Sequence, residues 1–74
     1  MSRTQKICFQ DSQGKVLFCI PDGGFIRLLY GNGERYFSIC RYLDEEHAEI
    51  DGVSYSALEF AKRMEQNGIS YAPA

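Results

Sequence analysis

The sequence predicts an α+β domain, an antiparallel β-meander of about five to six short strands with one C-terminal α-helix packed on one face. Turn signals rich in Gly, Asn and Asp recur about every ten residues, and β-branched and aromatic residues fill the intervals. A capped, amphipathic segment then closes the chain. Its 74 residues leave room for a single domain, 1–74, in which we expect 1–5 and 72–74 to be flexible.

Turn chemistry predicts how the strands pair. Asn-Gly at 32–33 and Asp-Gly at 51–52 are preferred pairs for two-residue type I′ turns, and we expect two-residue turns also at 13–14 and 44–45. Each turn determines which residues face each other across a hairpin. The predicted cross-strand pairs are Cys8 with Cys19, Leu28 with Phe37, Ile26 with Ile39, Ile39 with Ile50, Ile50 with Val53, and Ala48 with Tyr55.

Alternation along these strands separates an inner from an outer face. In the first hairpin the inner face takes Ile7, Phe9, Val16, Phe18 and Ile20. The predicted outer face carries Cys8, Leu17, Cys19, Phe25, Leu29, Tyr36, Cys40 and Tyr42. This face is too apolar for plain solvent surface, and such patches commonly bind partners. Alternatively, the sheet curls into a small SH3-like barrel and part of the face lines a second core.

The last predicted element is a helix whose two ends are both marked. Residues 56–59 (Ser-Ala-Leu-Glu) form a capping box, and Tyr55 and Phe60 occupy the positions of a hydrophobic staple. Gly68 fits the left-handed position that follows a helix C-terminus. The helix should therefore span about 57–67, with its apolar stripe on the inner face of the sheet.

The residues that could perform chemistry are few. Cys8, Cys19 and Cys40 form an odd set without a C-x-x-C spacing, so we expect three reduced thiols and no bound metal or cofactor. A bond between Cys8 and Cys19 is the alternative, because the predicted register places them opposite each other. Cys40 and His47 are the candidates for a nucleophile and its base, but the predicted register makes them diagonal neighbours about 7–8 Å apart. That separation is too long for a direct hydrogen bond. The sequence therefore predicts no catalytic residue and no enzyme.

Charge argues against nucleic acid as a partner, and the length of the apolar runs argues against a membrane. The formal net charge is −2 and the pI about 5.2, so the cationic excess typical of nucleic-acid binding is missing. Arg27 points outward in the predicted register while Arg35 and Arg41 begin on the other side. We therefore expect binding to short DNA or RNA at physiological salt to be weaker than about 10 μM. The longest apolar run, 16–20, is too short to span a bilayer. We expect a cytoplasmic protein.

Segment 41–47 (Arg-Tyr-Leu-Asp-Glu-Glu-His), Tyr55 and segment 59–73 resemble the C-terminal half of small uncharacterised accessory proteins of conjugative transposons in gut Firmicutes. The resemblance implies a mobile-element accessory protein of a bacterial cytoplasm, and it brings no catalytic residues.

From the residues themselves we expect a non-enzymatic module that self-associates, as a homodimer, or docks a protein partner through its outer sheet face. The interaction residues would be Leu17, Phe25, Leu29, Tyr36 and Tyr42. A nucleic-acid-binding accessory factor is the alternative function.

Overall fold

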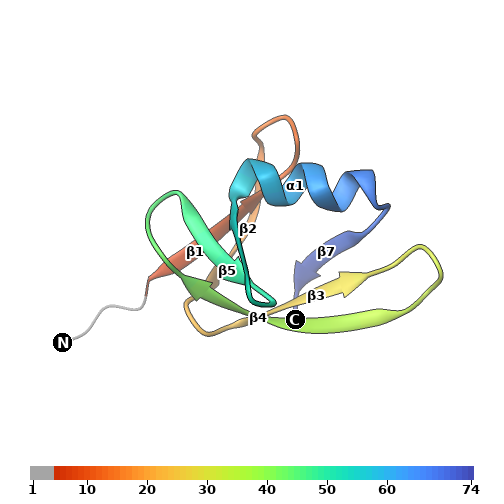
Figure 1. The fold of residues 1–74 in the computed structure, drawn as a ribbon, viewed down its shortest axis with the longest axis horizontal. Coiled ribbons are helices and arrows are strands. Elements are labelled where there is room, and N and C mark those ends of the chain that lie inside the picture. The colour runs from red at the N-terminus through yellow and green to blue at the C-terminus, as the bar shows by residue number, and fades with distance from the viewer. Residues whose placement is uncertain (1–4) are drawn as a thin grey trace.

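A computed structural model describes residues 5–74 and confirms the predicted α+β class (Figure 1). Six strands lead into one helix, and a seventh strand follows it. The elements are β1 (Lys6–Gln10), β2 (Val16–Pro21), β3 (Phe25–Leu29), β4 (Arg35–Tyr42), β5 (His47–Ile50), β6 (Val53–Ser56), α1 (Ala57–Gln66) and β7 (Ser70–Pro73).

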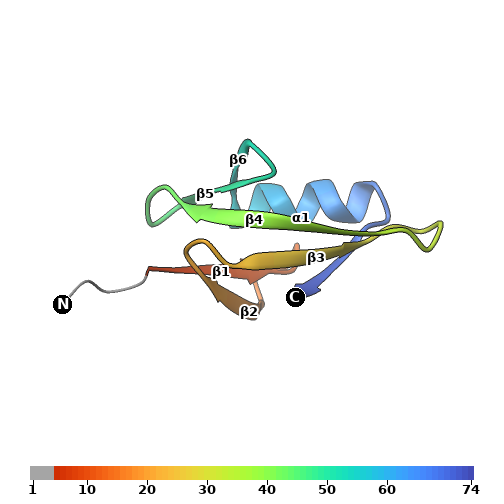
Figure 2. The same ribbon diagram turned by 90° about the horizontal axis from the view of Figure 1, so that it is seen from below.

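All strand pairs are antiparallel, and they form two sheets. β1 and β2 pair only with each other, and the larger sheet has the order β6-β5-β4-β3-β7. Figure 2 looks onto β3 and β4 from the side away from α1, which lies behind β4 in this view. Within residues 5–74 no strand ladder joins the two sheets or closes the larger one on itself. The larger sheet therefore has two faces, one toward the core and one toward solvent.

One buried cluster joins both sheets and the helix, so the described residues contain no second core. Phe60 of α1 lies at its centre, with its ring centroid 5.4 Å from that of Phe9 and 5.2 Å from that of Tyr71. The remaining members come from every layer of the fold: Ile7, Ile20, Ile26, Leu28, Cys40, Ala48, Ile50, Met64 and Ile69. Burial of this apolar surface is the main force that holds the hairpins against the helix.

Both predicted helix ends are confirmed. The Ser56 hydroxyl accepts a hydrogen bond from the Glu59 backbone N–H (3.1 Å), and the Glu59 carboxylate accepts one from the Ser56 backbone N–H (3.2 Å). These bonds satisfy donors that a helix N-terminus leaves free, and they hold the pKa of Glu59 below its usual value. At the other end Gly68 has φ +66°, and the Ile69 N–H donates to the Met64 carbonyl at 2.9 Å. This pattern is a Schellman ending.

The first hairpin keeps its predicted register despite a different turn. Gly14 has φ +91° and the Asp11 N–H donates to the Lys15 carbonyl, which makes a three-residue loop in place of the expected two-residue turn. An irregularity between Phe9 and Gln10 then shifts the ladder back by one residue. Cys8 therefore lies opposite Cys19 as predicted. Phe9 is buried as expected, whereas Val16, predicted to face inward, is exposed next to the loop.

The strand β4 is inverted relative to the prediction. Turn 32–33 is wrong because the Tyr30 N–H donates to the Glu34 carbonyl, so the loop has three residues, 31–33, with Gly33 at φ +90°. Turn 44–45 is also wrong, because the ladder beyond it pairs Tyr42 with Ala48. The observed pairs are Ile26 with Ser38, Leu28 with Tyr36, Phe25 with Ile39, Arg27 with Phe37, Cys40 with Ile50 and Arg41 with Glu49.

The register is shifted by one residue both between β3 and β4 and between β4 and β5. The side chains of β3 and β5 therefore point to their predicted faces, whereas those of β4 point to the opposite face. The turn at 51–52 is confirmed, since Ile50 pairs with Val53 and Ala48 with Tyr55.

The strand β7 was not predicted and corrects the expectation of a flexible tail at 72–74. Ala72 pairs with Arg27 and Pro73 with Ile26, which makes β7 an edge strand of the larger sheet. The Tyr71 hydroxyl also donates to the Gln10 carbonyl at 2.6 Å, which links β7 to β1. The expected flexibility of 1–5 falls mostly outside the described residues. In the described part of the chain no helix is long and apolar enough to cross a membrane.

Candidate functional site

The side of the larger sheet that faces away from α1 is the candidate site, and we call it the outer sheet face. Pairing and alternation place residues of β3 and β4 there. They are Phe25, Arg27 and Leu29 on β3 and Arg35, Phe37, Ile39 and Arg41 on β4. All except Ile39, which is partly buried, are exposed to solvent.

Only two of the five predicted interaction residues lie on this face. Phe25 and Leu29 are there, with exposed fractions of 52% and 41%. Leu17 is exposed but belongs to β2 in the smaller sheet. Tyr36 pairs with Leu28 and so lies on the opposite side of the hairpin, and Tyr42 packs against the core.

The inversion of β4 explains why the sequence analysis missed Phe37, and it moves Cys40 from the expected outer face into the core. Phe37 is 61% exposed on the outer sheet face, whereas Cys40 has no exposed surface. The signal that could have identified Phe37 is Gly33, which is preferred at the left-handed position of a three-residue loop.

Three arginines share the outer sheet face, contrary to the expectation from the predicted register. Arg27, Arg35 and Arg41 are all exposed, and Glu49, opposite Arg41, is the one acidic residue among the outward positions of β3, β4, β5 and β7. The single ion pair in residues 5–74 joins His47 and Asp44, so none of the three guanidinium groups forms an ion pair within the described chain. The face is therefore positive although the whole chain carries −2.

Glu34, next to Arg35 in sequence, is directed away from it. Its carboxylate accepts a hydrogen bond from the Tyr36 hydroxyl, and that bond raises the pKa of Tyr36. Because successive residues of a strand point to opposite sides, this bond holds the negative charge on the side away from Arg35. Glu34 accordingly forms no ion pair with Arg35.

The two exposed phenylalanines are close neighbours on the face. Phe37 lies opposite Arg27, and Phe25 lies opposite Ile39. Phe25 and Phe37 are therefore diagonal partners across the ladder, about 7–8 Å apart by strand geometry. Leu29 and Arg35 form the next pair along the hairpin. The result is an apolar, aromatic centre with arginines on either side.

A shallow pocket beside the β4–β5 turn is the other place with titratable groups. It has about 390 Å³ of empty space, open solvent included, and Lys6, Asp44 and His47 are among its lining residues. Asp44 Oδ1 lies 3.0 Å from His47 Nδ1 and 2.8 Å from the Glu46 backbone N–H. The N–H of Glu46 first, and then His47, lower the pKa of Asp44.

Neither cysteine environment provides a nucleophile beside this pair. Cys40 is buried, and loss of solvent raises its pKa to about 11, so its thiol stays protonated at neutral pH. Cys8 lines the pocket but is oxidised. The expected distance of about 7–8 Å between Cys40 and His47 was calculated from the predicted register of β4, which is wrong.

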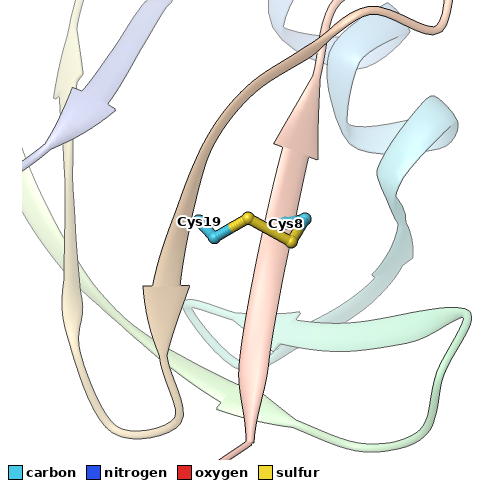
Figure 3. Close-up of a disulfide and its surroundings, with 2 residues drawn as sticks. All are labelled: Cys8 and Cys19. Carbon is cyan, nitrogen blue, oxygen red and sulfur yellow. A yellow bond between two sulfur atoms is a disulfide. The ribbon is translucent and has the colours of Figure 1, made fainter.

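The expectation of three reduced thiols is wrong for two of them. Cys8 and Cys19 form a disulfide, and only Cys40 is free among the described residues. Figure 3 shows the two side chains reaching across from neighbouring strands. The pairing follows from the register, because directly opposite residues of an antiparallel pair approach closely and these two have Cα atoms 4.0 Å apart.

Among residues 5–74 no group of three or more His, Cys, Asp and Glu side chains is arranged to hold a metal ion. No family model, no curated protein and no solved structure matches this chain. The resemblance of the C-terminal half to conjugative-transposon proteins accordingly stays a prediction.

Proposed function

We propose that this protein is a non-enzymatic binding module that acts through its outer sheet face and binds an anionic macromolecule. The observation that carries the proposal is the presence of Arg27, Arg35 and Arg41, none of which forms an ion pair within the described chain, on one exposed face. A chain with more acidic than basic residues that still gathers three arginines on one face has a local charge opposite to its net charge. A positive face of this kind is complementary to a negatively charged partner.

Retention on immobilised heparin tests this proposal. We expect retention near neutral pH, despite a pI of about 5.2, with elution by moderate salt because the contacts are electrostatic. The triple variant Arg27→Ala, Arg35→Ala, Arg41→Ala should flow through. As a matched control, the variant Lys15→Ala, Lys62→Ala, Arg63→Ala loses the same three charges from other exposed positions and should be retained. Equal behaviour of the two variants would refute the assignment of the face.

Self-association through the same face is the second candidate function, and its apolar centre favours it. Phe25, Leu29 and Phe37 together expose a patch of the kind that small proteins bury in symmetric dimers. Against it, a second copy would bring its own arginines to the interface. Sedimentation at about 100 μM decides the matter. A dimer that Leu29→Glu converts to a folded monomer supports this candidate, and a monomeric wild type eliminates it.

We also propose, from the resemblance of the C-terminal half, that the protein is an accessory protein of a bacterial mobile element. Segment 59–73 carries most of that resemblance. The position of the gene tests it: the gene should lie among those of an integrated conjugative element, and a location outside any such element contradicts the proposal.

A further inference from the structure

The arrangement of charge and aromatic rings on the outer sheet face identifies its partner more closely. We infer that this face binds single-stranded nucleic acid, with bases stacked on Phe25 and Phe37 and backbone phosphates held by Arg27, Arg35 and Arg41. The inference rests on the proposed function, because it names the anionic macromolecule that the face would bind. Each part of it follows from a separate observation.

The first observation is the exposure of the two rings. Phe37 is 61% and Phe25 52% exposed, and both belong to the β3–β4 ladder, in which Phe37 pairs with Arg27 and Phe25 with Ile39. An exposed ring on a rigid sheet offers a flat apolar surface, and unpaired bases stack on such surfaces whatever their sequence. A duplex hides these base faces within its own stack. The two rings therefore favour a single strand.

The second observation is the spacing of the charges. Arg35 and Arg41 lie on β4 at either side of Phe37, and Arg27 lies directly across from Phe37 on β3. From Arg35 to Arg41 the strand advances by about 20 Å at about 3.3 Å per residue. A flexible anionic strand can follow β4 over this length and place phosphates beside the arginines while its bases reach the rings.

Other kinds of partner would use only one of the two kinds of side chain on this face. A purely electrostatic ligand such as heparin uses the arginines but gains nothing from Phe25 and Phe37. An apolar protein partner would use the rings but would have to bury three unpaired guanidinium groups, which is costly without matching carboxylates. A single strand satisfies both kinds of side chain at once.

Fluorescence anisotropy with a labelled oligothymidylate of about twelve nucleotides tests the inference. We expect a Kd on the order of 10 μM or tighter at about 50 mM salt, and weaker binding by at least tenfold to a duplex of equal length. If three phosphates are neutralised, affinity should fall about twentyfold between about 50 and 200 mM salt.

Two double variants separate stacking from charge. Phe25→Ala with Phe37→Ala should weaken binding to the oligothymidylate at least tenfold, given the usual contribution of base stacking, and leave heparin retention unchanged. Val16→Ala with Leu58→Ala removes two exposed apolar side chains elsewhere and should change neither. Circular dichroism of each variant shows whether the fold is kept.

The possible failures are distinguishable. If the duplex binds as tightly as the single strand, or if the phenylalanine variant binds like wild type, stacking is refuted while heparin retention leaves the proposed function intact. If neither oligonucleotide nor heparin binds, both proposals are wrong. If the phenylalanine variant instead converts a dimer to a monomer without altering oligonucleotide binding, the face is a self-association surface and the inference is overturned.

Discussion

The disulfide between Cys8 and Cys19 makes the sharpest prediction about stability. The bond closes a loop between residues that are 11 positions apart, and loop-closure entropy assigns to it about 2.8 kcal/mol at 25 °C. For a domain of this size each kcal/mol shifts the Tm by about 4–8 °C. Reduction of the oxidised protein should therefore lower the Tm by about 10–20 °C. The hairpin itself should persist, because Ile7, Phe9 and Ile20 still anchor it in the core.

The assay is thermal unfolding of the oxidised protein with and without reductant, preceded by mass determination under denaturing, non-reducing conditions. The oxidised protein should be lighter than the reduced one by about two mass units, because two thiol hydrogens are lost. The variant Cys8→Ala with Cys19→Ala is the control, and its Tm should not respond to reductant. A full thiol count in protein treated with oxidised glutathione, or an unchanged Tm after reduction, refutes the reasoning.

Three further predictions concern the helix and the free thiol. Gly68→Ala should lower stability by about 1 kcal/mol because of the left-handed φ, whereas Gly31→Ala, at a position without a positive φ and with open space for a Cβ, should leave the Tm unchanged. The lowered pKa of Glu59 stabilises the fold above the carboxyl pKa of the unfolded chain, and this contribution disappears as pH falls through the lower, folded value. The Tm difference between wild type and Glu59→Gln should accordingly be larger at neutral pH than in acid. Cys40, with a pKa raised to about 11, should be alkylated at least about a hundredfold more slowly in native than in denatured protein at mildly alkaline pH.

The disulfide also bears on where the protein works. Disulfides persist in oxidising compartments and are rare in the cytosol, so the expected cytoplasmic location and the Cys8–Cys19 bond point in different directions. Alkylation of thiols in acid-quenched cells decides between them. Two reactive thiols at Cys8 and Cys19 indicate a reducing compartment, and protection of both indicates an oxidising one.

An element of this chain could be predicted from the sequence when the residues that specify it lie within the element or next to it. The helix could be placed almost to the residue because its capping box, staple and Gly68 ending all lie within the helix or next to it. The strand β7 could not be, because Ser70–Pro73 has no strand pattern of its own. Its partner β3 lies more than 40 residues earlier in the chain, and only the complete fold brings the two strands together. Because β7 is an edge strand, it tolerates Pro73.

The outer sheet face could be predicted only in part. Its β3 half was predicted correctly, since Phe25 and Leu29 point outward in both registers. Its β4 half was predicted inverted, because the loops at 31–33 and 44–46 each contain one residue more than assumed, and a single residue exchanges the two faces of a strand. Hydrophobic pattern alone does not prevent this error, since β4 has apolar or aromatic residues at both odd and even positions.

The orientation that β4 adopts is informative because it is not the one that would bury the larger apolar side chains. It places Cys40 in the core and leaves Phe37 exposed, with Ser38 rather than Ile39 on the inner side. Departures from the usual preference for apolar burial are expected where a surface is used for binding. Phe37→Ser should therefore leave the Tm within a few degrees of wild type, since an exposed side chain contributes little to stability, and should still impair binding by the outer sheet face. A large loss of stability would mean instead that Phe37 packs inside the fold, and that the positive, aromatic face does not exist as described.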